Sequence, residues 1–321
     1  MAEYKSINGT KIQDFTSDPA NPLEGQVWYN TTSNVLKIST PVVSAWATAN
    51  SMGTGRYLLA GAGTQTAALA FGGGYPAFAQ TESYNGTNWT EVNDLNTARY
   101  SLGGAGATNT AALGFGGYRS SNSSLTAATE TWNGTNWTEV NDLNTARRAL
   151  ASAGTNTAAL AFGGQPVTAV TETWNGTNWT EVNDLNTARR AIAGCGVNNT
   201  AALAFGGSPG AATGKTETWN GTNWTEVNDM NTARDGLGSA GTNTAALAIG
   251  GRVPNAPSTP TAVTEEWNGT NWTEVNDLNT AREYLAAAGT TTAALAFGGK
   301  PATAATEEFS ETGGTTTIDT E

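Results

Sequence analysis

The stretch NGTNWTEVNDLNTAR, Asn85–Arg99, decides the fold because it recurs along the chain. Identical copies begin at Asn133, Asn175 and Asn268, and a copy that differs only at Met230 begins at Asn220. A Gly-Gly doublet also closes an apolar segment in every repeat, and successive doublets lie 43 to 48 residues apart. A period of this length is typical of architectures in which each repeat is one supersecondary unit. The doublets occupy 72–73, 116–117, 163–164, 206–207, 250–251 and 298–299.

An arginine follows each tryptophan of this stretch after ten residues. The five clear pairs are Trp89 and Arg99, Trp137 and Arg147, Trp179 and Arg189, Trp224 and Arg234, and Trp272 and Arg282. Trp46 and Arg56 keep the same spacing although the residues around them have diverged. These tryptophans and arginines are therefore expected to be structural. The spacing predicts six repeat units, one of them divided between the two ends of the chain.

Each repeat contains four segments that favour β-strands, and the third copy is the clearest: RRALASAG, TAALAFGG, TETW and NWTEV. Asn-Gly between the last two predicts a two-residue type I′ hairpin, which would place Trp174 opposite Thr177 and Glu172 opposite Trp179. In TAALAF, Leu and Phe lie on one strand face and Ala on the other, so neighbouring sheets can interdigitate. We therefore expect an all-β fold, a six-bladed β-propeller of four-stranded blades.

The split repeat predicts how such a propeller closes. We expect Val42–Ala49 to be the outer strand of the blade whose inner strands run from Arg282 to Phe309. This gives two domains, an N-terminal leader with a short β-hairpin over 1–41 and the propeller over 42–321. One glutamate per repeat is expected to pair with the repeat arginine, because a buried carboxylate needs a partner. These glutamates are Glu82, Glu130, Glu172, Glu217, Glu265 and Glu307.

The Gly-Gly doublet after an apolar strand, the Glu-x-aromatic and the following Trp resemble the kelch repeat family of propellers. The resemblance spans roughly residues 42 to 309. The interval between the aromatic and the Trp, Trp174 to Trp179, is shorter than in that family, which we expect to change the hairpin and leave the architecture unchanged.

Composition excludes several classes of function. The formal net charge of −12 argues against nucleic-acid binding, which depends on clustered Lys and Arg. No apolar run is long enough for a membrane span, and MAEYKSINGTKIQ lacks the apolar core of a secretory signal. The chain has no histidine, so the commonest general base and metal ligand are absent. Its one cysteine, Cys195, replaces a Ser or Ala of other repeats and is expected to be a core residue.

Enzymatic interpretations find little support. TWNGTNW contains the Gly-x-x-Trp of the sialidase Asp-box turn, but an aromatic residue stands where the box has aspartate. Galactose oxidase chemistry requires His ligands. Carboxylates equivalent to Glu172 and Glu181 recur from blade to blade, which indicates packing and solvation in preference to a single acid–base pair. We therefore expect a non-enzymatic protein with no cofactor and no metal, and a sugar-active enzyme is the remote alternative.

The positions that differ between repeats are the candidates for binding. They are the residue after each repeat arginine and the loops after the doublets, which we expect to share one face at a mouth of the central channel. Neutral drift would also produce such variation, whereas loops on a rigid scaffold commonly carry recognition. The candidate binding residues are Tyr57, Tyr100, Tyr118, Arg119, Arg148, Arg190, Asp235, Arg252, Glu283 and Lys300.

The N-terminal segment indicates the kind of assembly to which the protein belongs. NPLEGQVWYNTTSNVLKIST, Asn21–Thr40, predicts a hairpin from Gln26–Tyr29 to Val35–Ser39, behind a polar lead of about twenty residues that is typical of a linker. EGQVWYNTTSNVLK resembles a leader of virion structural proteins of tailed bacteriophages. The pattern as a whole is similar to kelch-type proteins of marine phages, cyanobacterial phages among them.

This resemblance implies a structural protein of the virion, at the tail, fibre or capsid surface, assembled in the host cytoplasm. Its expected partners are other virion proteins through the leader and a host surface glycan or protein through the variable face, with no nucleic acid and no membrane insertion. A cytoplasmic kelch-like adaptor that binds another protein is the alternative.

Overall fold

The computed structural model describes residues 12–19, 25–254 and 259–318, and none of these residues is helical. The chain divides into two compact units, Met1–Ala45 with Glu311–Glu321, and Trp46–Ser310. The sequence predicted a boundary at 41/42 and a propeller that includes 311–321, so this division differs in both respects.

The second unit is built from four-stranded antiparallel sheets in which spatial order follows the chain. Short hairpins, β10 (Tyr118–Arg119) with β11 (Ser124–Leu125) and β24 (Arg252–Val253) with β25 (Thr259–Pro260), extend two of the variable loops. The sheets, each from first to last strand, are β4 (Ala60–Thr64), β5 (Ala67–Phe71), β6 (Thr81–Tyr84) and β7 (Trp89–Val92); β8 (Gly103–Thr108), β9 (Ala111–Phe115), β12 (Thr129–Trp132) and β13 (Trp137–Val140); β14 (Ala151–Gly154), β15 (Ala159–Phe162), β16 (Thr171–Trp174) and β17 (Trp179–Val182); β18 (Ala193–Asn198), β19 (Ala201–Phe205), β20 (Thr216–Trp219) and β21 (Trp224–Val227); β22 (Gly238–Gly241), β23 (Ala246–Ile249), β26 (Thr264–Trp267) and β27 (Trp272–Val275).

The last sheet draws its fourth strand from the N-terminal part of the chain. Its order places β3 (Val35–Ala49) beside β30 (Thr306–Ile318), followed by β29 (Ala293–Phe297) and β28 (Ala286–Gly289). Trp46 packs on Phe309 with ring centroids 5.1 Å apart, and its carbonyl accepts a hydrogen bond from Asn279 Nδ2 at 3.1 Å, as the Trp137 carbonyl does from Asn96. The prediction that Val42–Ala49 completes this sheet is confirmed.

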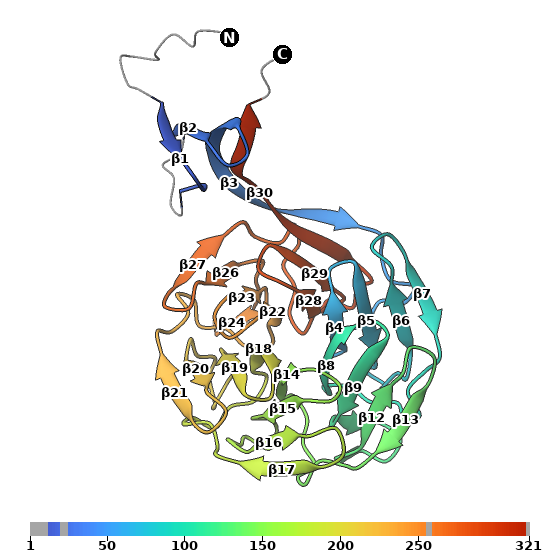
Figure 1. Ribbon diagram of the computed structural model, residues 1–321. Coiled ribbons are helices and arrows are strands. Elements are labelled where there is room, and N and C mark those ends of the chain that lie inside the picture. The colour runs from blue at the N-terminus through green and yellow to red at the C-terminus, as the bar shows by residue number, and fades with distance from the viewer. Residues whose placement is uncertain (1–11, 20–24, 255–258, 319–321) are drawn as a thin grey trace. The chain divides into compact units, whose positions relative to one another are not determined.

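The sheets of the second unit follow one another around a common centre, with the first strand of each innermost (Figure 1). Each inner strand contacts the next, and β28 contacts β4. The apolar core lies between sheets: Leu160 and Phe162 pack on Ala202, Ala204 and the tryptophans of the following sheet. Equivalent clusters lie between the other neighbouring sheets, so the predicted packing of a Leu/Phe face on an Ala face is confirmed. The arrangement is consistent with a propeller-like fold.

The predicted register of the outer hairpin was wrong. Trp174 lies opposite Trp179, and Glu172 lies opposite Glu181. The turn contains four residues, because Asn175 Oδ1 accepts hydrogen bonds from the amides of Thr177 and Asn178 and so holds a wider Asx-type loop. Gly176, with φ at 91°, supplies the left-handed position of that loop. As a consequence the two indole rings are direct cross-strand neighbours, with centroids 5.4 Å apart.

The repeated polar stretch joins each sheet to the next one. Asn93 Nδ2 donates to the Thr135 carbonyl and to Asn136 Oδ1 in the following hairpin, at 2.9 and 2.8 Å. Asn96 donates through its backbone and side chain to Glu130 Oε2 at 2.7 and 2.8 Å. The asparagines of the repeated stretch therefore bond to groups of the next sheet, which explains why the stretch is repeated.

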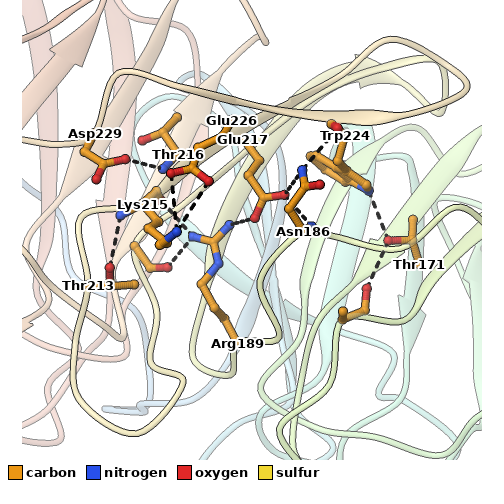
Figure 2. A network of polar contacts seen from close by, with 12 residues as sticks. Thr171, Asn186, Arg189, Thr213, Lys215, Thr216, Glu217, Trp224, Glu226 and Asp229 are labelled. Atoms are coloured by element: carbon orange, nitrogen blue, oxygen red, sulfur yellow. Dashed lines mark hydrogen bonds and ion pairs between the residues drawn. The ribbon is translucent and has the colours of Figure 1, made fainter.

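An ion pair between the repeat arginine and the repeat glutamate lies inside each sheet, as predicted. Figure 2 shows one example, in which Arg189 donates to Glu217 at 2.7 Å and to the carbonyls of Gly206 and Lys215 at 2.8 and 2.6 Å. The Arg189 and Glu217 side chains are 0% and 1% exposed, and burial lowers the pKa of each repeat arginine from its usual value. The other pairs are Arg56–Glu82, Arg99–Glu130, Arg147–Glu172, Arg234–Glu265 and Arg282–Glu307, with N–O distances of 2.7 to 3.2 Å.

The first unit contains the predicted N-terminal hairpin. β2 (Val27–Asn30) pairs antiparallel with β3, with Val27 opposite Ile38 and Asn30 opposite Val35. A short strand that was not predicted, β1 (Gln13–Phe15), lies parallel to β2 within the polar lead. Asp18 accepts hydrogen bonds from Trp28 and Asn30 and pairs with Lys37 at 2.7 Å. Parts of the lead, residues 1–11 and 20–24, lie outside the described residues.

Candidate functional site

The two sets of variable positions meet, residue by residue, at one end of the sheets. The residue after a repeat arginine forms an antiparallel bridge with the residue after the Gly-Gly doublet of the same sheet. Tyr57 follows the same rule more loosely, because its carbonyl accepts from the amide of Gly74 at 2.7 Å. The bridges hold these positions through the backbone, so their side chains are not needed to maintain the pairing. The bridged pairs are Tyr100–Tyr118, Arg148–Gln165, Arg190–Ser208, Asp235–Arg252 and Glu283–Lys300.

The next residue of each connector adopts a left-handed backbone conformation that the sequence did not reveal. The φ angles there lie between 49° and 63°, and only Gly236 is a glycine. In this conformation each amide donates to the carbonyl of the equivalent residue in the preceding sheet, at 2.7 to 2.9 Å. The bonds form one cycle, since the amide of Leu58 donates to the carbonyl of Tyr284. The full series is Leu58 to Tyr284, Tyr284 to Gly236, Gly236 to Ala191, Ala191 to Ala149, Ala149 to Ser101 and Ser101 to Leu58.

This cycle forms the floor of a cavity of about 330 Å³ at the variable end. A non-glycine residue in the left-handed region is strained, and such strain is found at ligand-binding sites more often than elsewhere. Below the cycle, the apolar side chains of the following positions, Leu102 and Leu150 among them, line a smaller recess. The cavity is lined by Tyr57, Leu58, Tyr75, Tyr100, Ser101, Arg148, Ala149, Gln165, Arg190, Ala191, Arg252 and Tyr284.

One side of the cavity is aromatic and cationic. The Arg148 guanidinium lies 4.6 Å from the centre of the Tyr118 ring, and its Nη1 donates to the Tyr100 hydroxyl at 3.2 Å. Tyr100 packs on Tyr118 at 5.3 Å and on the edge of Tyr75 at 5.8 Å. Arg190 Nη1 donates to Gln165 Oε1 at 2.7 Å. Burial raises the pKa of Tyr100, and the neighbouring Arg148 opposes that shift, so Tyr100 is a neutral hydroxyl at physiological pH.

The other side carries compensated charges. Arg252 donates to both carboxylate oxygens of Asp235 and lies 3.7 Å from Glu283. Glu283 also pairs with Lys300 at 3.0 Å. The hydrogen bond to Asp235 raises the pKa of Arg252 above its usual value. The Arg252 guanidinium stacks over Tyr284, 5.4 Å from the ring centre. Its positive charge is therefore balanced by groups of the protein itself.

The candidate residues named from the sequence have different positions in this site. Tyr57, Tyr100, Arg148, Arg190 and Arg252 line the cavity. Four other candidates contact lining residues or their partners. Tyr118 packs on Tyr100, Asp235 and Glu283 pair with Arg252, and Lys300 pairs with Glu283. Arg119 does not line the cavity and donates to Thr126 within its own loop.

Sequence reasoning missed Tyr75, Gln165 and Tyr284 at this cavity. Gln165 follows its doublet at the position of Tyr118, Arg252 and Lys300, but it is neither aromatic nor charged and so was not selected. Tyr75 lies one residue further into its loop, because Gly74 follows the doublet there. Tyr284 occupies the connector position held by Leu58, Ser101, Ala149, Ala191 and Gly236 in the other repeats. Its aromatic character there was the signal that could have identified it. Part of the loop after β24, residues 255–258, lies outside the described residues.

The part of the chain that the structure describes contains no group of three or more His, Cys, Asp or Glu side chains placed to hold a metal ion. In the same residues no helix is both long and apolar enough to cross a membrane. No protein-family model matches this sequence, and no curated protein matches it.

Proposed function

We propose that this chain is a non-enzymatic structural protein of a phage virion, and that its variable end binds a partner on the host surface. The single observation that carries the proposal is the cavity at that end. Its lining comes from non-repeated side chains held on backbone bridges, on a scaffold whose other contacts recur from sheet to sheet. A rigid scaffold with replaceable side chains is suited to recognition.

The scaffold that we propose is a closed six-bladed propeller of kelch-like blades. The core cluster in which Leu295 and Phe297 meet Ala68 and Ala70 supports closure, because it joins the last sheet to the first. The hydrogen bond from Leu58 to Tyr284 joins the same two sheets at the mouth of the cavity. In such a propeller the outermost strands remain sheet edges, but they are short, as the four-residue β7 and β13 are, and short edges limit edge-to-edge association.

The virion setting rests on the resemblance of the N-terminal stretch EGQVWYNTTSNVLK to phage leaders. In this proposal the leader and its β2–β3 hairpin attach the protein to other virion proteins at the tail, fibre or capsid surface, and the variable end of the propeller binds the host. Assembly takes place in the host cytoplasm. The negative net charge favours partners other than nucleic acid and anionic membranes.

Two measurements test the proposal. Immunogold labelling of purified virions, from a phage whose genome encodes this chain, should decorate the particle surface. Fluorescent propeller should also bind host cells. Binding should be lost after combined alanine replacement at the variable end, at Tyr118, Arg119, Arg148, Arg190, Arg252 and Lys300.

The matched control replaces exposed threonines at the opposite end of the sheets, Thr157, Thr244 and Thr292, by alanine. That control should bind cells as the original chain does, because none of its three residues lies at the variable end. Absence of label from virions, together with capture of a cytoplasmic partner through the variable end, would favour the adaptor function instead. Loss of cell binding in the control set alone would show that the wrong end had been assigned.

A further inference from the structure

The cavity at the variable end contains two cations that no carboxylate compensates. Among the described residues, no carboxylate oxygen lies within ion-pair distance of Arg148 or Arg190, whereas Arg252 on the same cavity contacts both Asp235 and Glu283. The partners of Arg148 and Arg190 are the neutral groups of Tyr100 and Gln165. Each guanidinium is thereby oriented while several of its N–H donors remain available.

These two unpaired guanidiniums belong to a protein with a formal net charge of −12. In a chain with 27 acidic and 15 basic residues, an accessible arginine without an acidic neighbour is unexpected, and here two lie on adjacent sheets at one cavity. A guanidinium presents a fork of donors that matches the two oxygens of a carboxylate. The charge pattern therefore favours an anionic ligand at the Arg148 and Arg190 side.

The charges around Arg252 add little to the attraction of an anion. Arg252 and Lys300 carry the countercharges of Asp235 and Glu283, and neither carboxylate lines the cavity. The positive charge available to a ligand is therefore that of Arg148 and Arg190. One carboxylate matches the donor fork of a guanidinium through its two oxygens.

The aromatic residues indicate what carries the carboxylate. Tyr57, Tyr75 and Tyr100 line the same cavity as the two arginines, and Tyr75 is 70% exposed. A tyrosine presents an apolar ring face and a polar hydroxyl, which together suit a ring that has C–H groups on its faces and hydroxyls at its edge. A pyranose has this character. The cavity volume of about 330 Å³ lies at the lower end of the range for small-molecule sites.

We propose that the cavity binds a saccharide unit that carries one carboxylate, with Arg148 and Arg190 on the carboxylate and the tyrosines against the sugar ring. This inference rests on the proposed binding function of the variable end and names the chemistry of its ligand. The Gln165 amide and the tyrosine hydroxyls serve the sugar hydroxyls.

The test compares two ligands that differ in one group. Methyl β-glucuronide and methyl β-glucoside share a pyranose ring and differ in having a carboxylate or a CH₂OH group. Binding to the full chain is measured by NMR chemical-shift titration and by calorimetry. The glucuronide should bind at least about tenfold more tightly, since a charge-assisted bidentate contact is lost in the glucoside. An oligouronate, as the polymeric source, should bind at the same residues, and added salt should weaken its binding.

The variants locate the contact. Arg148→Gln and Arg190→Gln should each weaken glucuronide binding by about tenfold or more, which brings its affinity toward that of the glucoside. Lys215→Gln is the matched control, because it removes one positive charge from an exposed ion pair with Glu226 outside the cavity. It should bind the glucuronide as the original chain does. Circular dichroism and thermal unfolding verify that each variant is folded.

Several outcomes would overturn the inference. They are equal affinity for glucuronide and glucoside, no binding of the glucuronide by the folded original chain, or undiminished binding in Arg148→Gln and Arg190→Gln. Tighter binding of an acidic tripeptide through the same arginines would also overturn it, in favour of a peptide ligand. If Arg148→Gln abolishes cell binding while no uronate binds, the proposed function survives and the sugar assignment fails.

Discussion

Glu217→Gln is the substitution that tests most directly how this fold is held together. The change removes the negative charge that faces the Arg189 guanidinium and retains the volume of the side chain. Arg189 is 0% exposed, and after the change its neutral partners are the carbonyls of Gly206 and Lys215. Water cannot solvate the isolated charge, so the cost is that of an uncompensated buried cation.

The expected cost is about 3–5 kcal/mol, the range found when one partner of a buried ion pair is removed. For a unit of this size 1 kcal/mol corresponds to about 2–4 °C, so the Tm should fall by roughly 6–20 °C. Glu226→Gln is the control within the same sheet. Its carboxylate pairs with Lys215 at 3.3 Å, but the two side chains are 50% and 36% exposed, so the loss should stay below about 1 kcal/mol.

Thermal and urea unfolding of the full chain, followed by tryptophan fluorescence, measure both variants. A double-mutant cycle with Arg189→Met adds a second criterion. The double variant should be more stable than the sum of the single effects predicts, by about 1–3 kcal/mol, because no unpaired charge remains. Additive effects, or a loss below about 1 kcal/mol for Glu217→Gln, would refute the view that the repeated ion pairs stabilise the sheets.

Three further predictions concern other parts of the chain. Cys195 is buried and burial raises the pKa of its thiol to about 12, so a thiol reagent at pH 8 should leave the native protein unmodified and label it only after unfolding; labelling of the folded chain would contradict this. The hydrogen bond from Lys37 lowers the pKa of Asp18 in the folded state. The ionised Asp18 therefore stabilises the first unit above the unfolded pKa, and this stabilisation is lost as pH falls below about 4. The fluorescence of Trp28 should change in that window, and Asp18→Asn should abolish the change. Gly236→Ala should lower the free energy of unfolding by about 1–2 kcal/mol, because φ there is 63° and the new Cβ would lie 2.8 Å from the Tyr284 ring. Ala149→Gly, at φ 52°, should be neutral or stabilising in the same thermal unfolding assay. Equal losses of stability in both variants would show that left-handed geometry is not the cause.

The parts of the fold that depend on side-chain identity could be predicted from the sequence. The spacing of Trp46 and Arg56 was enough to place β3 beside β30, although its neighbours had diverged. The pairing of repeat arginine and glutamate followed from their recurrence in each unit. The hairpin register could not be predicted in the same way, because Asn175 forms its own bonds to the amides of Thr177 and Asn178 and so widens a turn that the Asn-Gly pair alone suggests.

The floor of the cavity could not be predicted because its bonds are between backbone groups. Leu58, Ser101, Ala149, Ala191 and Tyr284 share no side-chain chemistry, yet all adopt the same left-handed conformation and donate to the preceding sheet. The conformation is imposed by the position of the connector between two sheets. A sequence pattern records side chains, and a site of this kind becomes visible only when the sheets are assembled.

The bridged pairs at the mouth bear on the choice between neutral drift and recognition. Across three bridges the side chains complement each other: Tyr100 with Tyr118, Asp235 with Arg252, and Glu283 with Lys300. Drift at unrelated exposed positions does not produce matched partners, since each position would change independently of the residue opposite. The two bridges without a complementary charge are those of Arg148 and Arg190, and they lie on adjacent sheets at the same cavity. Two guanidiniums at one cavity that lack a carboxylate partner are what a binding site for an anionic group requires, because the missing countercharge is then supplied by the ligand.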